Sequence, residues 1–460
     1  MSNSKDFNQD VAFSFYTNER YAEDLIYHSG YALFYLYKDG HYVKLTPEQF
    51  RKEIISFVRQ NHARQNWTIN SIKDIVSWVE HECLRQTEKE DRHYIGFKDC
   101  LYNTKTFETE PHDKEKLVTY YLPYNFDETK APTPTFDKFL SSSLVKYKTL
   151  EPDPDLISIV QEMFGSIFID NLKACTAFFL YGESGQNGKS TLTSLLRKMI
   201  GKDFYSSLSL LDLSQRFTLS ALIGKKANIA DELDDRFGSS KMFKQLVQGD
   251  VVHGEHKYGG NFDLENRAKF FYSSNVMPTF DGIDGGLRRR IKIIPFYREF
   301  RNDDKDKDFD LSEKLEKEIP GIVGWALEGS KRLVENKYNF TKCEAVTQMM
   351  NEFEDEASSA LRFFRDVYVV DETEQMWIPV QKVYDEYVNW MIMEGLKKCA
   401  GKKRFVKDIK GVWRGLDGKY CRYSDGDKYN GQTLMCINAY RKDSIVSEGE
   451  DVVGQLKFDT

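Results

Sequence analysis

Lys189 and Ser190 follow a glycine-containing segment that could bind a triphosphate. The apolar segment 174–182, ACTAFFLYG, runs into ESGQNGKST and then into a helical pattern that stops at Gly201. Glycines let backbone N–H groups turn inward around phosphate oxygens, and the following helix adds a positive dipole. In such a Walker A loop Lys189 would contact the β- and γ-phosphates of ATP, and the Ser190 hydroxyl would hold Mg²⁺. The predicted nucleotide-binding residues are Gly182, Ser184, Gly185, Gln186, Asn187, Gly188, Lys189, Ser190 and Thr191.

The loop departs from the strict pattern GxxxxGK[ST] at its first glycine. That pattern requires glycine where this chain has Glu183, whereas Gly182 lies one residue earlier. Two interpretations are open: the loop is one residue longer than usual, or Glu183 opens it. The bland alternative is a chance Gly-Lys-Ser in an ordinary loop, and the strand and helix patterns on either side argue against it.

Two adjacent carboxylates, Asp231 and Glu232, follow a short apolar strand in KKANIADEL. Asp231 is suited to the magnesium shell, and Glu232, which faces the other way along the strand, would polarise the attacking water as a general base. A pair of acids at a strand end is more often a solvated feature. Its position after the loop favours a Walker B motif.

An amide and three arginines flank two further apolar strands. KFFYSSN ends in Asn275, whose amide would hydrogen-bond the γ-phosphate or the attacking water, and IKIIPF is preceded by Arg288, Arg289 and Arg290. Guanidinium groups suit the charge that spreads over a transferring phosphoryl group, and a neighbouring subunit would supply one as an arginine finger. A ring follows from that arrangement. The alternative is a surface basic cluster or a contact to a phosphate backbone.

These residues must be positioned by strands that end at one edge of a sheet. Between about 136 and 296, apolar strands alternate with helices, which predicts an α/β fold with a parallel sheet covered on both faces. Upstream, apolar runs in 32–45 flank an Asp-Gly turn and predict a hairpin, and Thr46 with Pro47 predicts a capped helix start. Residues 311–336 read as helical throughout.

The chain of 460 residues is long enough for about three domains. Residues 122–135 carry three prolines and no periodicity, which predicts a boundary, and a further small domain begins near 357. We expect an α+β N-terminal domain over 1–130, the α/β domain over 131–350 and a C-terminal domain over 351–460.

Composition limits the class of protein. A net charge of -7 and a pI near 5.8 exclude a surface that is basic throughout, but leave DNA binding by local basic patches open. The seven cysteines form no CxxC pair, which favours a reducing cytosol and no structural metal cluster. No signal peptide and no run of about 18 apolar residues is found, so we expect a cytoplasmic protein without membrane contact.

The four strand ends, in this order, resemble the phage, plasmid and poxvirus-type primase-helicase family, whose helicase module belongs to superfamily 3 of the AAA+ ATPases. Residues 243–260 resemble that superfamily's extra motif, 273–296 its sensor and arginine-finger stretch, and 318–329 its lid helix. The resemblance implies an AAA+ core that binds ATP and Mg²⁺. It also implies that Arg289 is the finger, with Arg290 in reserve.

The resemblance covers roughly residues 90 to 335 and is less clear over the first 90. Those 90 residues are too few for the catalytic primase domain of larger relatives and carry no acidic metal-binding triad. We therefore expect a helicase without primer synthesis.

The resemblance also implies DNA contacts. In relatives a hairpin between the Walker B and sensor strands projects into the channel of the ring, and here it carries His256 and Lys257, which taken alone would be solvated turn residues. The locally basic tail predicts a winged-helix-like domain, with 405–416 as recognition helix and 419–437 as wing, which would bind DNA or dock partners. Its predicted DNA-binding residues are Lys403, Arg404, Lys407 and Lys410.

The sequence thus predicts an ATP-dependent replicative DNA helicase. It would act as a homo-oligomeric ring, a hexamer by analogy, in replication of a phage or mobile element, with host replication proteins as further partners. One alternative is an origin-binding initiator in which ATP switches assembly and which unwinds little itself. Another is a P-loop kinase of small molecules, which would leave the basic tail without a role.

Overall fold

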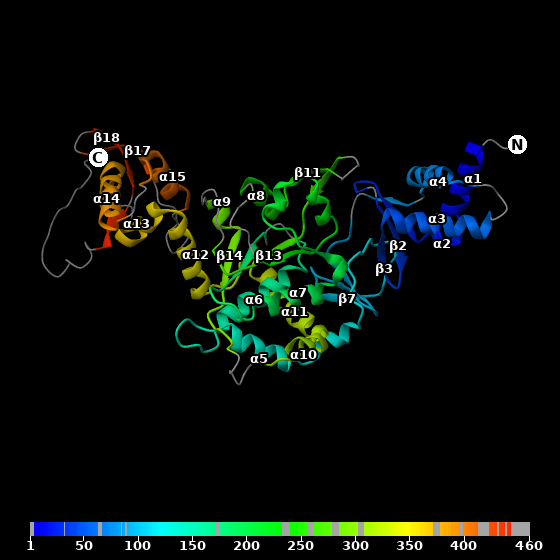
Figure 1. The fold of residues 1–460 in the computed structure, drawn as a ribbon, viewed down its shortest axis with the longest axis horizontal. Coiled ribbons are helices and arrows are strands. Elements are labelled where there is room, and N and C mark those ends of the chain that lie inside the picture. The colour runs from blue at the N-terminus through cyan, green and yellow to red at the C-terminus, as the bar shows by residue number, and fades with distance from the viewer. Residues whose placement is uncertain are drawn as a thin grey trace.

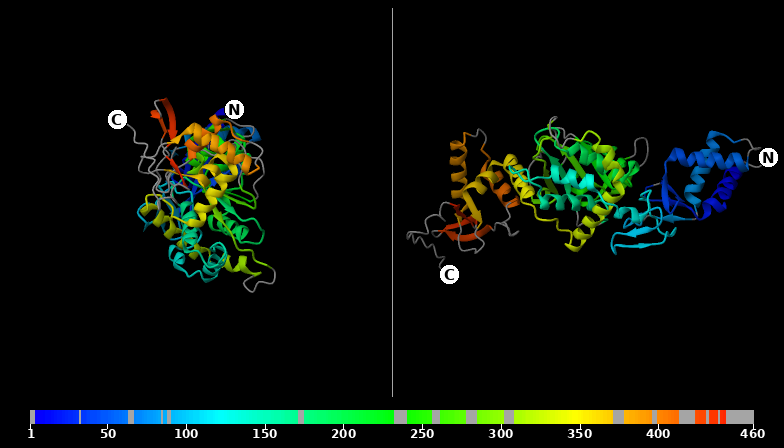
Figure 2. Two further views of the ribbon diagram at one scale, coloured as in Figure 1. Left: turned by 90° about the vertical axis from the view of Figure 1, so that its left-hand side faces the viewer. Right: turned by 90° about the horizontal axis from the view of Figure 1, so that it is seen from below.

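The computed structural model describes residues 4–31, 33–62, 67–83, 85–87, 90–170, 175–231, 240–255, 261–277, 285–301, 308–370, 378–395, 399–412, 423–429, 432–437 and 439–442. The N-terminal and C-terminal regions lie at opposite ends of a central region that is built around a sheet (Figures 1 and 2). None of the described helices is both long and apolar enough to cross a lipid bilayer.

The N-terminal region packs helices on a small mixed sheet with strand order β3-β2-β1-β4. Phe15, Phe50 and Ile75 are fully buried in its own apolar cluster. Its elements are α1 (Ser4–Tyr16), α2 (Glu19–Ala22), β1 (Leu25–His28), β2 (Leu33–Lys38), β3 (His41–Leu45), α3 (Pro47–Asn61), α4 (Ile69–Glu82) and β4 (Gln86–Thr87).

The predicted hairpin and the predicted helix start are both confirmed. Strands β2 and β3 pair with Lys38 opposite His41, and the turn residues Asp39 and Gly40 both have positive φ, as a tight primed turn requires. At the start of α3 the Thr46 hydroxyl accepts from the Gln49 backbone N–H, and the Gln49 side chain accepts from the Thr46 N–H. Local signals were sufficient here because both motifs close within a few residues.

A second antiparallel sheet, with order β5-β6-β7, leads into the central region. Tyr120, which follows it, lies edge-on to Phe204 and is fully buried, so this segment shares the central core. The elements are β5 (Tyr94–Gly96), β6 (Leu101–Asn103), β7 (Glu108–Glu110) and the 3₁₀ helix Phe126–Lys130.

Among the described residues, five parallel strands form the central sheet in the order β14-β8-β13-β10-β9. This confirms the predicted α/β class with a parallel sheet. Asp231 lies opposite Ser273, while Ser274 and Pro295 both lie opposite Tyr181, so these strands end at the same edge. The strands are β8 (Ala177–Tyr181), β9 (Tyr205–Ser206), β10 (Ala227–Asp231), β13 (Lys269–Ser274) and β14 (Ile291–Pro295).

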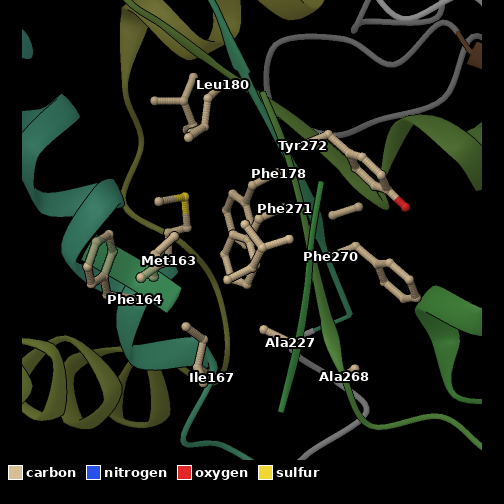
Figure 3. Packing of buried hydrophobic residues seen from close by; sticks show 14 of the residues in the cluster. Met163, Phe164, Ile167, Phe178, Leu180, Ala227, Ala268, Phe270, Phe271 and Tyr272 are labelled. Carbon is tan, nitrogen blue, oxygen red and sulfur yellow. The ribbon is translucent and has the colours of Figure 1, made fainter. Parts of the chain in front are cut away.

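Both faces of this sheet are covered, as its continuous burial requires. Figure 3 shows Phe178 and Phe271 on the side of Met163 and Phe164, which come from α6, and Phe270 on the other side. There the Phe270 ring lies 6.2 Å from Phe243 of α8. The helices of the central region are α5 (Pro134–Ser143), α6 (Pro154–Ser166), α7 (Lys189–Ile200), α8 (Ser240–Gln248), α9 (Gly285–Arg288), α10 (Leu311–Lys317) and α11 (Ile319–Glu335).

The prediction of continuous helix over 311–336 is wrong at Glu318, where α10 ends and α11 begins. Pro320 lies in the first turn of α11. Proline is tolerated in the first turn of an α-helix but breaks or kinks the helix in its interior. The Glu318 carboxylate accepts from the backbone N–H groups of Thr135 at 3.0 Å and Phe136 at 2.9 Å, which stabilises the N-terminus of α5.

An antiparallel hairpin and a C-terminal region complete the fold. The hairpin joins β11 (Val251–Glu255) to β12 (Asn261–Glu265), with Val252 and Leu264 buried. The C-terminal region has its own apolar cluster, which includes Phe363, Tyr387 and Phe405. Helix α12 (Glu344–Ala357) precedes this region and packs on the central core through Val346, Met349 and Phe353. The elements of the C-terminal region are α13 (Ser359–Val367), β15 (Tyr368–Val370), β16 (Ile378–Pro379), α14 (Val380–Met393), α15 (Lys402–Val412), β17 (Tyr423–Tyr429), β18 (Gln432–Ile437) and β19 (Ala439–Arg441).

Candidate nucleotide-binding site

The loop that the sequence marks for phosphate joins β8 to α7 at the carboxyl edge of the sheet. Strand β8 ends at Tyr181 and α7 begins at Lys189. Gly188 caps the helix with φ at +93°, a left-handed conformation that favours glycine. Because Leu192, Leu196 and other apolar residues anchor α7 in the core, the N-terminus of the helix is held against the loop.

The Lys189 ammonium lies at the centre of the loop. It donates to Asn275 Oδ1 at 2.8 Å, to Asn187 Oδ1 at 2.9 Å and to the Gly182 carbonyl at 3.0 Å, with the Ser184 carbonyl at 3.4 Å. The structure thus brings Lys189 and Asn275 together from separate strand ends, as the sequence predicted. The side chain is buried, and a cation placed here would meet a phosphate with little competing water.

Burial lowers the pKa of Lys189 to about 8. Phosphate would favour the charged form, so nucleotide binding above that pKa should take up a proton. We expect uptake of about 0.9 of a proton at pH 9 and about 0.1 at pH 7, measured by calorimetry in two buffers that differ in ionisation heat. Nucleotide affinity should fall as the pH rises through 8.

The stability of the chain without nucleotide should change in the opposite direction. The pKa of Lys189 in the folded chain lies below its value in the unfolded chain, so the free energy of unfolding linked to this group rises as the pH increases from about 8 to about 10. Binding at pH 9 without proton uptake would contradict the assignment of Lys189.

The first turn of the loop is packed at Gly182. A Cβ at this position would lie 2.2 Å from Asn187 Nδ2 and 2.9 Å from the Phe296 carbonyl oxygen, so the site admits glycine alone. Glu183, in contrast, is exposed. Of the two interpretations that the sequence left open, the packing favours the longer loop that begins at Gly182.

Gly182→Ala is expected to weaken nucleotide binding by about tenfold or more. The added methyl group would overpack the loop at a cost of about 1–3 kcal/mol, and the loop is the part that binds the nucleotide. Glu183→Ala, one residue further and exposed, is the matched comparison and should bind normally. Fluorescent-nucleotide titration of both variants measures the difference. Normal binding by Gly182→Ala together with a loss in Glu183→Ala would instead place the opening of the loop at Glu183.

Asp231 ends β10 and is held by two residues of α7. Its carboxylate accepts from the Thr193 hydroxyl at 3.0 Å and pairs with the Arg197 guanidinium at 2.6 Å. Sequence reasoning missed both partners. Their spacing from Lys189, at four and eight residues, places all three on one face of the helix and was the available signal. The Asp231 side chain stays 42% exposed, so the carboxylate remains accessible to a cation.

Ser190, predicted to share a magnesium ion with Asp231, is exposed at the start of α7. A hydroxyl and a carboxylate are hard oxygen donors of the kind that Mg²⁺ prefers. The predicted general base, Glu232, lies outside the described residues.

A cavity of about 280 Å³ opens beside the far end of the loop. Gln186, Gly188 and Thr191 form one side, and the rings of Phe139 and Phe300 contribute to the other. The cavity therefore lies between the phosphate loop, α5 and the segment after β14, and its wall also includes Lys138 and Asp308.

The three arginines lie at the opposite edge of the sheet. Ile291, the residue after them, pairs with Ala177, the first residue of β8. Arg290 is buried and donates to the Gly286 carbonyl, and Arg288 pairs with Glu354 of α12, whereas Arg289 is exposed. The structure therefore does not bring Arg289 or Arg290 to the Lys189 loop of the same chain, and Arg290 is engaged within its own subunit.

The predicted DNA-binding residues are placed in part. Strands β11 and β12 form the expected hairpin, but His256 and Lys257 lie outside the described residues. On α15, Lys403 and Arg404 are exposed, and Arg404 pairs with the buried Asp408 at 2.7 Å. The side chains of Lys407 and Lys410 also lie outside the described set.

Two family models match separate parts of the chain. "D5 N terminal like" matches residues 16–144, and "Family of unknown function (DUF5906)" matches 180–290, from the end of β8 to the arginines. The first match begins well upstream of residue 90, where the resemblance seen in the sequence became less clear.

Curated relatives are distant and much longer than this chain. A "Putative helicase L207/L206" of Acanthamoeba polyphaga mimivirus is 24% identical over 370 residues, which are 75% of this chain and 37% of that protein. "Primase D5" of fowlpox virus is 27% identical over 158 residues, 32% of this chain and 20% of that protein. "Uncoating factor OPG117" of vaccinia virus is 25% identical over 229 residues, 45% of this chain and 29% of that protein. The chain thus spans about a third or less of these relatives.

Among solved structures, an apo form of the NrS-1 C-terminal region aligns with a TM-score of 0.48 at 12% identity, covering 90% of this chain and 95% of that one.

Proposed function

The chain is a relative of the phage- and poxvirus-type superfamily 3 primase-helicases, and from that premise we propose that it is an ATP-driven DNA helicase of replication. It hydrolyses ATP with Mg²⁺ at sites shared between neighbouring subunits of a ring. Since one relative is named a primase, the expected absence of primer synthesis stays a prediction that a primer-extension assay tests.

One observation carries this proposal: Lys189 and Asn275 meet at 2.8 Å, and Thr193 of the same helix binds Asp231. Three strand ends thus converge on the start of one helix. We assign the sheet to an AAA+ core because the loop strand β8 lies between β14 and β13, and β13 separates it from the acidic strand β10.

The triphosphate would lie over the N-terminus of α7, where helix dipole and Lys189 favour its charge. Ser190 and Asp231 would hold Mg²⁺, which neutralises charge on the transferring phosphoryl group. Glu232 would orient the attacking water, and Asn275 would bind the γ-phosphate. The 280 Å³ recess beside Thr191 offers room for base and ribose.

The proposed finger acts between subunits. Arg289 is exposed at the amino edge of the sheet, and five residues of β14 separate that edge from the loop edge, about 16 Å. A guanidinium at that distance cannot reach its own loop. A neighbour's Arg289 would therefore stabilise the transition state.

DNA would be gripped by the β11–β12 hairpin through His256 and Lys257. The C-terminal region would form a winged-helix-like module, with α15 as recognition helix and the β17–β18 hairpin as wing, through Lys403, Arg404, Lys407 and Lys410. Lys257 would bind phosphates and give affinity without base reading, whereas the C-terminal module would recognise an origin or dock partners.

Lys257→Ala is expected to lower strand separation and to make DNA affinity less steeply dependent on salt. The slope should fall by about 0.9 for each phosphate that the variant no longer neutralises. Binding titrations from low to high salt, beside forked-DNA unwinding, measure both effects. A variant that unwinds forked DNA normally would remove the hairpin from the mechanism.

ATP hydrolysis measured with and without single-stranded DNA, together with the mass of the assembly in ATP, tests the whole proposal. We expect DNA to stimulate phosphate release and ATP to favour a ring. The second candidate, an origin-binding initiator, is favoured by the basic helix α15 on a separate C-terminal core. Strong origin binding with little strand displacement would support it over the motor.

A further inference from the structure

A buried carboxylate joins the arginine stretch to the C-terminal helices. Glu354 of α12 has a side chain that is only 3% exposed. One carboxylate oxygen lies 2.6 Å from Arg365 Nη2 of α13, and the other contacts Arg288 Nε at the end of α9. Arg365 also donates from Nη1 to the Asn351 carbonyl at 2.7 Å. Two guanidinium groups from different parts of the fold thus share one acid.

Such a carboxylate fixes its partners firmly. A buried charge is costly unless it is paired, so displacing either arginine would leave the acid poorly compensated. Arg288 is therefore tied to α12, and Arg289 is its next residue in the chain. The backbone that presents the exposed Arg289 is held on one side by Glu354 and on the other by β14.

The same junction is connected to the basic helix α15. The Ser358 hydroxyl, at the start of α13, donates to Asp408 Oδ2 at 3.1 Å, and Asp408 pairs with Arg404 at 2.7 Å. Helix α15 also contacts α9 and α13 directly, and these helices lie side by side in Figure 1. A shift of α15 would be transmitted to Glu354 through α13, and to α9 by direct contact.

We propose that Glu354 is a positioning residue for Arg289, through which the C-terminal helices set the rate of ATP hydrolysis in the neighbouring subunit. The inference rests on the proposed function and adds a regulatory path to it. Engagement of α15 by DNA would change the position of α13, and Arg365 and Glu354 would carry that change to the finger.

A merely structural ion pair would hold α12 on the core without this effect. The two roles differ in what they leave intact. A positioning role predicts a lower kcat with an unchanged KM for ATP, because the variant's own loop is untouched. It also predicts that the loss is repaired by a neighbour with a correctly placed finger.

The test uses Glu354→Gln, which keeps the shape of the side chain and removes its charge. We expect kcat to fall by about 10- to 100-fold, the loss that a displacement of about 1 Å causes, with KM changed less than about twofold. Mixing this variant with Lys189→Ala subunits, which lack a working loop but keep their finger, should restore part of the activity.

Arg365→Gln is the second variant, because it leaves Glu354 paired with Arg288 and cuts only the connection to α13. It should retain hydrolysis without DNA better than Glu354→Gln and lose the stimulation by DNA. Arg362→Gln is the matched control: it removes a guanidinium from the same helix that pairs with Glu394 at the surface, at 3.2 Å, and should behave like the unmodified chain.

The inference is overturned if both Glu354→Gln and Arg365→Gln hydrolyse ATP at the unmodified rate with normal DNA stimulation. It is equally overturned if Glu354→Gln loses activity that mixing does not restore. If Glu354→Gln fails to fold, Arg365→Gln carries the test. Failure of the proposed function would look different: the unmodified chain would not hydrolyse ATP, or Lys189→Ala would hydrolyse it normally.

Discussion

Lys189→Ala is expected to lower the rate of ATP hydrolysis by about 10²- to 10³-fold, the loss that follows removal of a preorganised donor to a developing charge. The ammonium is already held within the loop by Asn275, Asn187 and Gly182, and a bound phosphate would replace one or more of these acceptors. Phosphate release at saturating ATP, with and without single-stranded DNA, measures the effect.

The variant should fold. Burial lowers the pKa of Lys189, which shows that the charged form is disfavoured by desolvation, and its removal relieves that cost. Lys198→Ala is the matched control: it lies on the same helix, pairs with Glu316 at 2.6 Å and is directed away from the loop. If Lys189→Ala hydrolyses ATP nearly as fast as the Lys198→Ala control, the loop is not the ATP site.

Arg289→Ala is expected to produce a similar loss, about 10³-fold, because an arginine finger stabilises the charge of the transition state. The distinguishing feature is complementation. Arg289→Ala subunits keep a working loop and Lys189→Ala subunits keep a finger, so mixed assemblies should regain hydrolysis that neither shows alone. Steady-state rates across mixing ratios measure this.

Arg290 provides the comparison. Its guanidinium is buried and bound to the Gly286 carbonyl of its own subunit, so Arg290→Ala should lower stability, and mixing should not repair it. Arg20→Ala, a change at an exposed arginine of the N-terminal region, should leave hydrolysis unaltered. An Arg289→Ala protein with normal hydrolysis would remove the finger from the mechanism.

Much of the fold could be read from the sequence because its signals are local. The hairpin turn at Asp39-Gly40, the capping box at Thr46 and the alternation of apolar strands with helices each depend on neighbouring residues, and each is found. The meeting of Lys189 with Asn275 could also be expected, since parallel strands end at one edge.

The rest depends on packing between distant segments. Arg197 pairs with Asp231 because α7 packs against β10. Arg288 pairs with Glu354 because α12 packs against β14. The interpretation that the loop begins at Gly182 is favoured by packing against Asn187 and against the Phe296 carbonyl, which is 114 residues from Gly182. No pattern within a short window carries that information.

The placement of the loop and of Arg289 at opposite edges of one sheet has a consequence for assembly. In the proposed assembly each subunit would offer two unlike surfaces, so its contacts would be head-to-tail, and such contacts form a ring when the rotation between subunits closes. An open arc always leaves one loop without a guanidinium and one guanidinium without a loop. Closure removes both vacancies at once, and turnover per subunit should therefore rise sharply at the concentration where arcs close.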